Sequence, residues 1–121
     1  MAWEPISEEE LRSDIEDALD RMSLEQRKIW DVIKIEPKKW HQEPWGNEGG
    51  GFWVVALIGD RVIWYNDIED GFNQSTYTEY GRINEYWCCQ DELEWAVDNI
   101  INLLRDGYES QIRLGAPQPI A

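Results

Sequence analysis

The stretch Phe52-Trp-Val-Val-Ala-Leu-Ile58, Gly59-Asp60, Arg61-Val-Ile-Trp-Tyr-Asn66 decides the fold of this chain. Two apolar runs joined by a Gly-Asp pair predict a β-hairpin, because Gly59 can adopt the positive φ that a two-residue turn requires. Counting outward from the turn pairs Ile58 with Arg61, and Val55 with Trp64. In this register one face of the hairpin carries Trp53, Val55, Leu57, Val62 and Trp64. Since both faces are apolar, we expect a central hairpin covered on both sides, or one with a face that binds a partner.

Amphipathic segments on either side of the hairpin predict three helices. Ser7 followed by three glutamates is a capping-box pattern, and apolar residues then recur at helical spacing, which predicts a helix over residues 8–22. Ser23 begins a shorter second helix in the same way, and Pro37 closes it. Residues 93–104 carry a third apolar stripe, and Gly107 can adopt the left-handed conformation that ends a helix.

The remaining segments complete a small α+β domain. Residues 38–51 and 67–74 are predicted to form loops, and residues 75–80 and 83–87 two short strands. The order is two N-terminal helices, an antiparallel meander of about four strands, and a C-terminal helix packed on one face of the sheet. We expect one domain over residues 1–114 and a flexible tail over residues 115–121, which hold two prolines and no apolar periodicity.

Composition limits the classes of function. The 121 residues include 25 acidic and 11 basic side chains, for a net charge of −14. Gripping a phosphate backbone requires clustered Lys and Arg, so we expect no direct contact with nucleic acid. The longest apolar run, residues 52–58, is too short to span a membrane, and the N-terminal residues do not resemble a secretory signal. We therefore expect a soluble cytoplasmic protein.

The densest polar cluster is Asn66-Asp-Ile-Glu-Asp-Gly-Phe-Asn73, directly after the hairpin. Its carboxylates are those of Asp67, Glu69 and Asp70. They could form a solvated turn, a contact surface for a basic partner, or a centre for a hard cation and acid–base chemistry. Aligned on Gly71, the cluster lacks the ligand positions of a calcium-binding loop. We therefore assign no metal and no cofactor, and take the three carboxylates as candidates for partner binding.

Aromatic residues are the second candidate feature, since the chain has eight tryptophans. Those that fall in apolar stripes, and are predicted to lie in the core, are Trp30, Trp64 and Trp95. Burial explains Trp40 and Trp45 less well, and each could anchor an interface or fold back as a lid. Together with Tyr65 and Tyr77, they complete the predicted partner-binding set.

The remaining reactive side chains predict no catalytic centre. Cys88 and Cys89 are chain neighbours, so their Cα separation of about 3.8 Å is too short for an ordinary disulfide. This favours two reduced thiols over a strained redox switch. His41, the single histidine, has no Ser, Cys or Asp partner at the spacing of a catalytic triad, and we expect it on the surface.

Three segments carry a resemblance. Pro44-Trp-Gly46, Gly49-Gly-Gly-Phe-Trp-Val-Val55 and Trp64-Tyr-Asn-Asp-Ile-Glu-Asp-Gly-Phe-Asn73 resemble short uncharacterised bacterial proteins, over roughly residues 30–105. In size, acidity and helix–meander–helix order, the chain is also similar to immunity proteins that neutralise nuclease toxins of competing bacteria. That similarity implies a non-enzymatic inhibitor of a basic toxin or nuclease-like protein, and it assigns no functional residue.

Three functions remain open at this point. The first is an immunity-like binding protein whose acidic and aromatic surface occupies a basic protein partner, since opposite charge speeds association. The second is a small metal-dependent hydrolase that uses Asp67, Glu69 and Asp70. The third is an anti-defence protein that mimics nucleic-acid charge, because residues 4–20 could present regularly spaced carboxylates along one helix.

Overall fold

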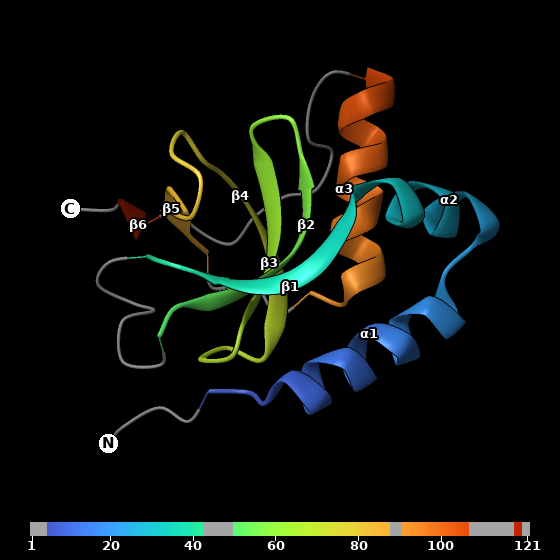
Figure 1. Ribbon diagram of the computed structural model, residues 1–121. Helices are drawn as coiled ribbons and strands as arrows, with labels where there is room; N and C mark the ends of the chain where they lie inside the picture. The colour runs from blue at the N-terminus through green and yellow to red at the C-terminus, as the bar shows by residue number, and fades with distance from the viewer. Residues whose placement is uncertain (1–4, 43–49, 88–90, 107–117, 120–121) are drawn as a thin grey trace.

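The computed structural model describes residues 5–42, 50–87, 91–106 and 118–119, which form three helices on one face of a four-stranded antiparallel sheet (Figure 1). Helices α1 (Glu8–Arg21) and α2 (Leu24–Ile33) precede strands β1 (Lys34–Trp40), β2 (Phe52–Ile58), β3 (Arg61–Asn66) and β4 (Gly71–Thr76), which are neighbours in that order. Strand β5 (Glu85–Tyr86) and helix α3 (Leu93–Asp106) follow, and β6 (Gln118–Pro119) pairs with β5. The predicted α+β architecture is confirmed.

The helices follow their sequence signals. The Ser7 hydroxyl oxygen accepts the Glu10 amide at 3.1 Å, so Ser7 caps α1 as predicted. Ser23 and Gln26 form a complete capping box at the start of α2, with distances of 2.8 and 3.2 Å. The Ser7 cap and the Ser23–Gln26 box satisfy amides that would otherwise lack a partner in the first turn of a helix.

The sheet has an apolar cluster on each face. The larger cluster lies between the sheet and the helices, and includes Leu11, Trp30, Val55, Ile63, Tyr65, Phe72, Leu93 and Val97. The smaller cluster, on the opposite face, consists of Trp40, Phe52, Val54, Val62, Trp64, Ile83 and Tyr86. The hairpin is therefore covered on both sides, which confirms the first of the two alternatives that its apolar faces allow.

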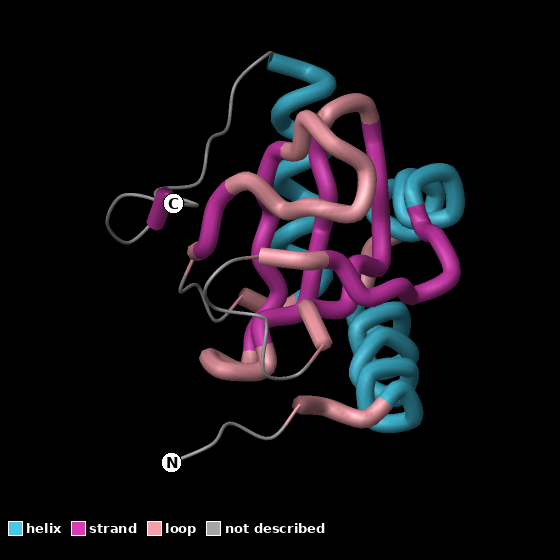
Figure 2. Tube along the Cα trace, turned by 60° about the vertical axis from the view of Figure 1, so that its left-hand side comes forward, coloured by secondary structure: helices cyan, strands magenta, loops and turns pink. Residues whose placement is uncertain are grey.

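The chain after β4 closes the smaller cluster. The His41 amide donates to the Gly81 carbonyl at 2.8 Å, and the Ile83 amide donates to the His41 carbonyl at 2.9 Å. The Asn84 amide donates to the Thr76 carbonyl at 3.0 Å, which continues the cover beside β4. The strands therefore lie between the helices on one side and this returning segment on the other (Figure 2).

The hairpin register departs from the prediction at Val55. The three pairs nearest the turn are as predicted, but Val54 rather than Val55 lies opposite Trp64. Strand β2 therefore has one extra residue, a β-bulge, and Val55 and Ala56 both contact the helix-side cluster. The predicted face is wrong for Val55 and Trp53, because the bulge moves both to the side of the helices.

Strand β1 takes the place of the end of the second predicted helix and of part of the loop predicted over residues 38–51. The prediction that Pro37 closes this helix is wrong, since α2 ends at Ile33 and the chain enters β1 at once. Its pairs with β2 run from Lys34–Ala56 to Trp40–Phe52, with an irregularity that contains Pro37. Proline has no amide to donate, but β1 is an edge of the sheet and needs ladder partners on one side only. Trp40 is 2% exposed, so packing in the smaller cluster accounts for it, contrary to the prediction.

Strand β4 also begins earlier than predicted, at Gly71. The polar residues 73–75 are typical of a loop, yet they are buried in this strand. Ser75 accepts the indole N–H of Trp64 at 2.9 Å, which compensates for the burial of both groups. The predicted bounds of the two short strands are therefore wrong, since β5 covers residues 85 and 86 alone.

Trp95 corrects a prediction about the core. Trp30 and Trp64 are buried as predicted, but Trp95 is 53% exposed. Helical spacing places Trp95 on the side of α3 away from the buried Val97 and Ile100, so the apolar stripe does not include it.

Some predictions fall on parts of the chain outside the described residues. Trp45, Cys88 and Cys89 lie there, as does most of the predicted tail, of which Gln118 and Pro119 form β6. Among the helices that are described, none combines the length and the apolar character needed to cross a membrane.

A substitution at Gly51 tests how closely β1 and β2 approach each other. Its φ is +108°, and a Cβ added there would lie 2.3 Å from the Trp40 carbonyl oxygen. Gly51→Ala should therefore lower the free energy of unfolding, measured in urea, by about 3 kcal/mol or more. The control is Gly59→Ala, since Gly59 has a φ of +56° but no described atom within 4 Å of an added Cβ. It should cost about 1 kcal/mol, and equal losses in the two variants would contradict the clash.

Candidate functional site

The N-terminal segment is fixed to the sheet at Ile6. Oδ2 of Asp67, the residue after β3, accepts the Ile6 amide at 2.8 Å, and Nε1 of Trp53 donates to the Ile6 carbonyl at 3.4 Å. Asp67 is 8% exposed, so the fold holds this carboxylate and it is not a solvated turn residue. Both backbone polar groups of Ile6 are thereby bonded, and α1 starts from a fixed point.

The other end of α1 is held by Arg21. Its guanidinium pairs with Glu92 at 2.9 Å and with Glu94 at 2.7 Å, at the start of α3. Between the two ends, Leu11 and Ala18 are buried in the helix-side cluster. The helix therefore spans the distance from the β3–β4 turn to the beginning of α3 (Figure 1).

A cavity of about 370 Å³, the first cavity, lies between α1 and the β3–β4 turn. The carboxylates that line it are Glu10 and Asp14 from α1, and Asp67 and Asp70 from the turn. Tyr65, Ser13, Pro5 and Ile6 complete the lining, so no basic side chain among the described residues borders this cavity.

A second cavity, of about 220 Å³, adjoins the first, since Asp14, Tyr65 and Asp70 line both. The carboxylates that it adds are those of Asp17, Asp91 and Glu92. Arg21 is the single basic residue among its described lining, and its charge is already paired with Glu92 and Glu94. We call the two cavities together the acidic groove.

Asp14 lines both cavities of the groove, and the surrounding negative charge makes its ionised form less favourable. Burial raises the pKa of Asp14, and the neighbouring charges of Asp17, Glu10 and Glu92 raise it further. Arg21 opposes this rise, but its effect is smaller. Ionised Asp14 is therefore less favourable than an exposed aspartate, because its surroundings already hold negative charge.

Tyr65 lies where the two cavities meet. It is 7% exposed, its ring packs edge-on against Phe72 at 5.0 Å, and its hydroxyl has no hydrogen-bond partner in the described part of the chain. Burial and the charges of Asp70, Asp14 and Asp67 raise the pKa of Tyr65 to about 12. The hydroxyl therefore stays protonated near several carboxylates.

The turn that carries Asp70 is shaped by local bonds. Oδ1 of Asn66 accepts the amides of Ile68 at 3.0 Å and Glu69 at 3.2 Å, which is an Asx-type turn. Asp70 then adopts a φ of +56°, a conformation that aspartate tolerates better than most residues. This geometry leaves Asp70 exposed at the edge of the groove while Asp67 points inward to Ile6.

Three of the predicted site residues meet at the groove. Tyr65, Asp67 and Asp70 all line the first cavity, so part of the acidic turn and one predicted aromatic residue lie together. Glu69 follows Asp67 by two residues but lines neither cavity. Trp45 lies outside the described residues.

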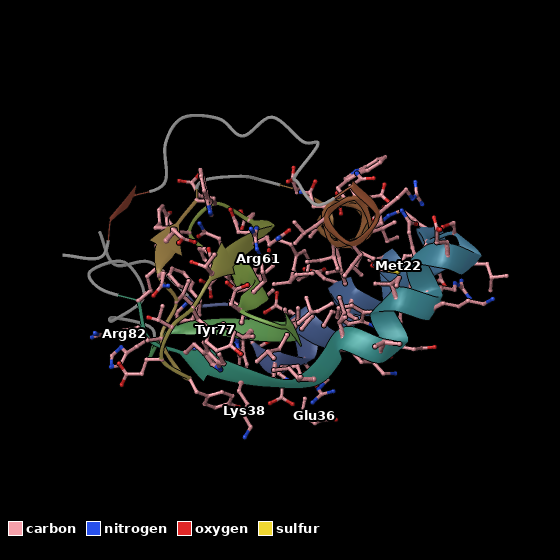
Figure 3. All side chains as sticks on the ribbon, turned by 90° about the horizontal axis from the view of Figure 1, so that it is seen from above. Met22, Glu36, Lys38, Arg61, Tyr77 and Arg82 are labelled. Atoms are coloured by element: carbon pink, nitrogen blue, oxygen red, sulfur yellow. The ribbon has the colours of Figure 1, made fainter. Side chains whose placement is uncertain are left out.

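Trp40 and Tyr77, the other predicted aromatic residues, lie away from the groove. Their rings meet edge-on at 5.2 Å, and the Tyr77 hydroxyl donates to the Gly59 carbonyl at 2.8 Å. They belong to the smaller cluster, whereas Tyr65 belongs to the helix-side cluster. Figure 3 shows Tyr77 over the strands and Met22 among the helices, on the other side of the molecule. The predicted aromatic set therefore does not form one surface.

Sequence reasoning did not include the groove residues of α1 or of the segment before α3 in the site. Glu10, Asp14 and Asp17 are spaced by four and three residues, which is the signature of one helix face and could have revealed them. Asp91 and Glu92 carry no such signal, because only the tertiary fold brings them beside α1.

Within the described residues, no three side chains of His, Cys, Asp or Glu come close enough together to hold a metal ion. No family model, no curated protein sequence and no solved structure matches the chain.

The bond between Asp67 and Ile6 gives a stability prediction. Asp67→Ala leaves the Ile6 amide without its acceptor and should lower the free energy of unfolding by about 2 kcal/mol, measured in urea. Glu69→Ala is the control on the same turn, and we expect a change within about 0.5 kcal/mol. A loss in Asp67→Ala no larger than in the control would show that this bond does not hold α1.

The carboxylates also predict how stability varies with pH. The pKa of Asp14 is raised from 3.8, so the folded protein binds a proton before the unfolded chain does, and stability rises as the pH falls from neutral through the folded pKa. Burial acts to raise the pKa of Glu94, but its bond to Arg21 lowers it overall from 4.5, so stability is lost as the pH falls below that value.

We therefore expect maximal stability in mildly acidic solution, measured by urea unfolding at a series of pH values. Asp14→Asn should weaken the rise between neutral pH and the maximum. Glu94→Gln should weaken the fall on the acid side. Wild-type stability that decreases steadily from pH 7 downward would contradict the raised pKa of Asp14.

Proposed function

We propose that this protein is a small, cytoplasmic, non-enzymatic binding protein whose acidic groove occupies a basic protein partner, in the manner of an immunity protein or inhibitor. A toxin or nuclease-like protein with exposed Lys and Arg is the partner class that this charge favours. The proposal keeps the acidic turn of the sequence analysis as part of the interface and adds α1 to it. Among the aromatic candidates it keeps Tyr65.

The observation that carries the proposal is the meeting of carboxylates from three separate segments around one groove. Asp14 and Asp17 come from α1, Asp70 from the β3–β4 turn, and Glu92 from the segment before α3. Like charges held this close destabilise one another, and a cationic partner would convert that repulsion into attraction. An acidic groove of this kind costs stability in the free protein, which is typical of functional surfaces.

The net charge supports the same function. At −14 the whole molecule attracts basic proteins from a distance, and the groove gives that attraction a defined place. Charged groups at the edge of an interface act mainly on the rate of association and on its dependence on salt. Binding through the groove should therefore be strongly weakened by salt, because the Debye length shrinks from about 10 Å at 0.1 M to about 3 Å at 1 M.

The test begins by capturing a partner from a lysate of the source organism on the tagged protein, with elution by a salt gradient. The identified partner is then purified, and its association rate with wild type is compared with that of the combined variant Asp14→Asn, Asp17→Asn and Asp70→Asn. We expect the rate to fall at least tenfold. Asparagine tolerates the positive φ of residue 70, so the turn is kept.

The matched control is the combined variant Asp20→Asn, Asp31→Asn and Asp60→Asn. It changes the net charge equally, and none of its positions lines the groove. We expect an association rate within about twofold of wild type, apart from the general effect of net charge. An equal fall in association rate in both variants would show that only overall charge matters. An unchanged rate in the groove variant would show that the interface lies elsewhere.

A further inference from the structure

We propose that the first cavity receives one lysine or arginine side chain of the partner, and that Tyr65 Oη accepts a hydrogen bond from its cationic group. This inference rests on the proposed function and specifies what enters the groove. It assigns separate roles to the polar and the apolar parts of the cavity wall.

The polar part of the wall calls for a cation. Asp14 and Asp70 line the first cavity, and no basic side chain among the described residues lines it with them. Arg21 meets the same two carboxylates in the second cavity, but its charge is paired with Glu92 and Glu94. An inserted ammonium or guanidinium group would supply the missing positive charge.

The environment of Tyr65 points independently to a ligand. Its side chain is more than nine-tenths buried, it lines both cavities, and its hydroxyl has no hydrogen-bond partner within the described residues. The hydroxyl is not one of the fully buried polar atoms that lack a partner, so it is accessible from the groove to a hydrogen-bond donor. The phenol oxygen can accept from a cationic donor while its proton remains available to a carboxylate. Both ammonium and guanidinium groups are such donors.

The apolar part of the wall favours a protein side chain as the source of the cation. Pro5 and Ile6 line the same cavity as the carboxylates. Lysine and arginine carry their charge at the end of an apolar stem, which can pack on such residues while the head group reaches the carboxylates. A free polyamine carries charges along its length, and would place one of them against Pro5 and Ile6. The hydrogen bond that the Ile6 amide donates to Asp67 holds this wall in place before the ligand arrives.

The experiment uses the full chain labelled with ¹⁵N, titrated with the capped peptides acetyl-Gly-Lys-Gly-amide and acetyl-Gly-Arg-Gly-amide at low salt. We expect saturable shifts of the backbone amides of Asp14, Tyr65 and Asp70 with at least one peptide. The same lysine peptide with its ε-amino group acetylated should give no such shifts. Equal shifts with the acetylated peptide, or shifts that never saturate, would overturn the proposal.

Two tyrosine variants separate the cavity from general charge attraction. Tyr65→Phe keeps the ring against Phe72 but removes the hydroxyl, and should weaken peptide binding about tenfold, the usual effect of losing a hydrogen bond to a charged group. Tyr77→Phe, on the other face of the sheet, should bind as wild type does. Asp14→Asn removes a carboxylate charge from the same cavity and should also weaken peptide binding. Wild-type affinity in Tyr65→Phe would overturn the role of the hydroxyl.

A titration with spermidine tests whether the cation comes from a protein side chain or from a free polyamine. At about 150 mM NaCl, where long-range attraction is screened, we expect spermidine to leave these amides unshifted. Saturable binding of spermidine under those conditions would assign the cavity to a free polyamine and overturn the protein side chain as occupant.

The two proposals can fail separately. If the groove variant loses the captured partner while Tyr65→Phe keeps wild-type affinity for both partner and peptides, the acidic interface stands and the inserted side chain is wrong. If the groove variant keeps the partner, the proposed function is wrong, and the peptide titration decides the cavity by itself.

Discussion

Neither face of the β2–β3 hairpin can be left in water, and the rest of the chain is arranged to cover it. Three helices cover one face, while Trp40 and the segment around Ile83 cover the other. Burial of apolar surface contributes about 25 cal/mol for each Å², so uncovering either face would cost many kcal/mol. This requirement places α1 beside the turn that follows β3. The acidic groove exists because the core brings α1, this turn and the segment before α3 together.

The groove concentrates carboxylates along α1, a helix that is attached to the rest of the fold at both ends. Asp67 bonds Ile6 before the helix, and Arg21 bonds Glu92 and Glu94 at its end. These bonds and the buried apolar face of α1 offset the repulsion around Asp14. The stability of the whole fold therefore offsets the repulsion between the carboxylates, and they stay in place instead of moving apart. A site held in this way is organised before its partner arrives, which saves ordering entropy on binding.

Much of the fold could be predicted because its signals are local. Ser7, Ser23 and the Gly59 turn each act within a few residues, and the structure confirms all three. The bulge at Val55 has no such signal, since an extra residue in an apolar strand does not alter its composition. The sequence does not predict strand β1, because Pro37 indicates a break in regular structure. Proline is tolerated there because β1 lies at the edge of the sheet, and only the tertiary fold determines that position.

The candidate site was predictable to a lesser extent for the same reason. Asp67, Asp70 and Tyr65 are close in sequence and were found together. The carboxylates of Asp91 and Glu92 reach the groove only through the packing of α3. The sequence leaves a solvated turn open as one role for Asp67, since the bond of Asp67 to Ile6 joins positions far apart in the chain.

Pro37 has a consequence for how copies of this protein meet one another. Strand β1 is an edge of the main sheet, and an open edge is a template on which a second chain can add a strand. Pro37 offers no N–H to such a strand, and the exposed Lys34 and Lys38 would face the same residues of an identical neighbour. A chain with eight tryptophans is thereby protected against edge-to-edge aggregation at this strand, even where crowding brings copies together.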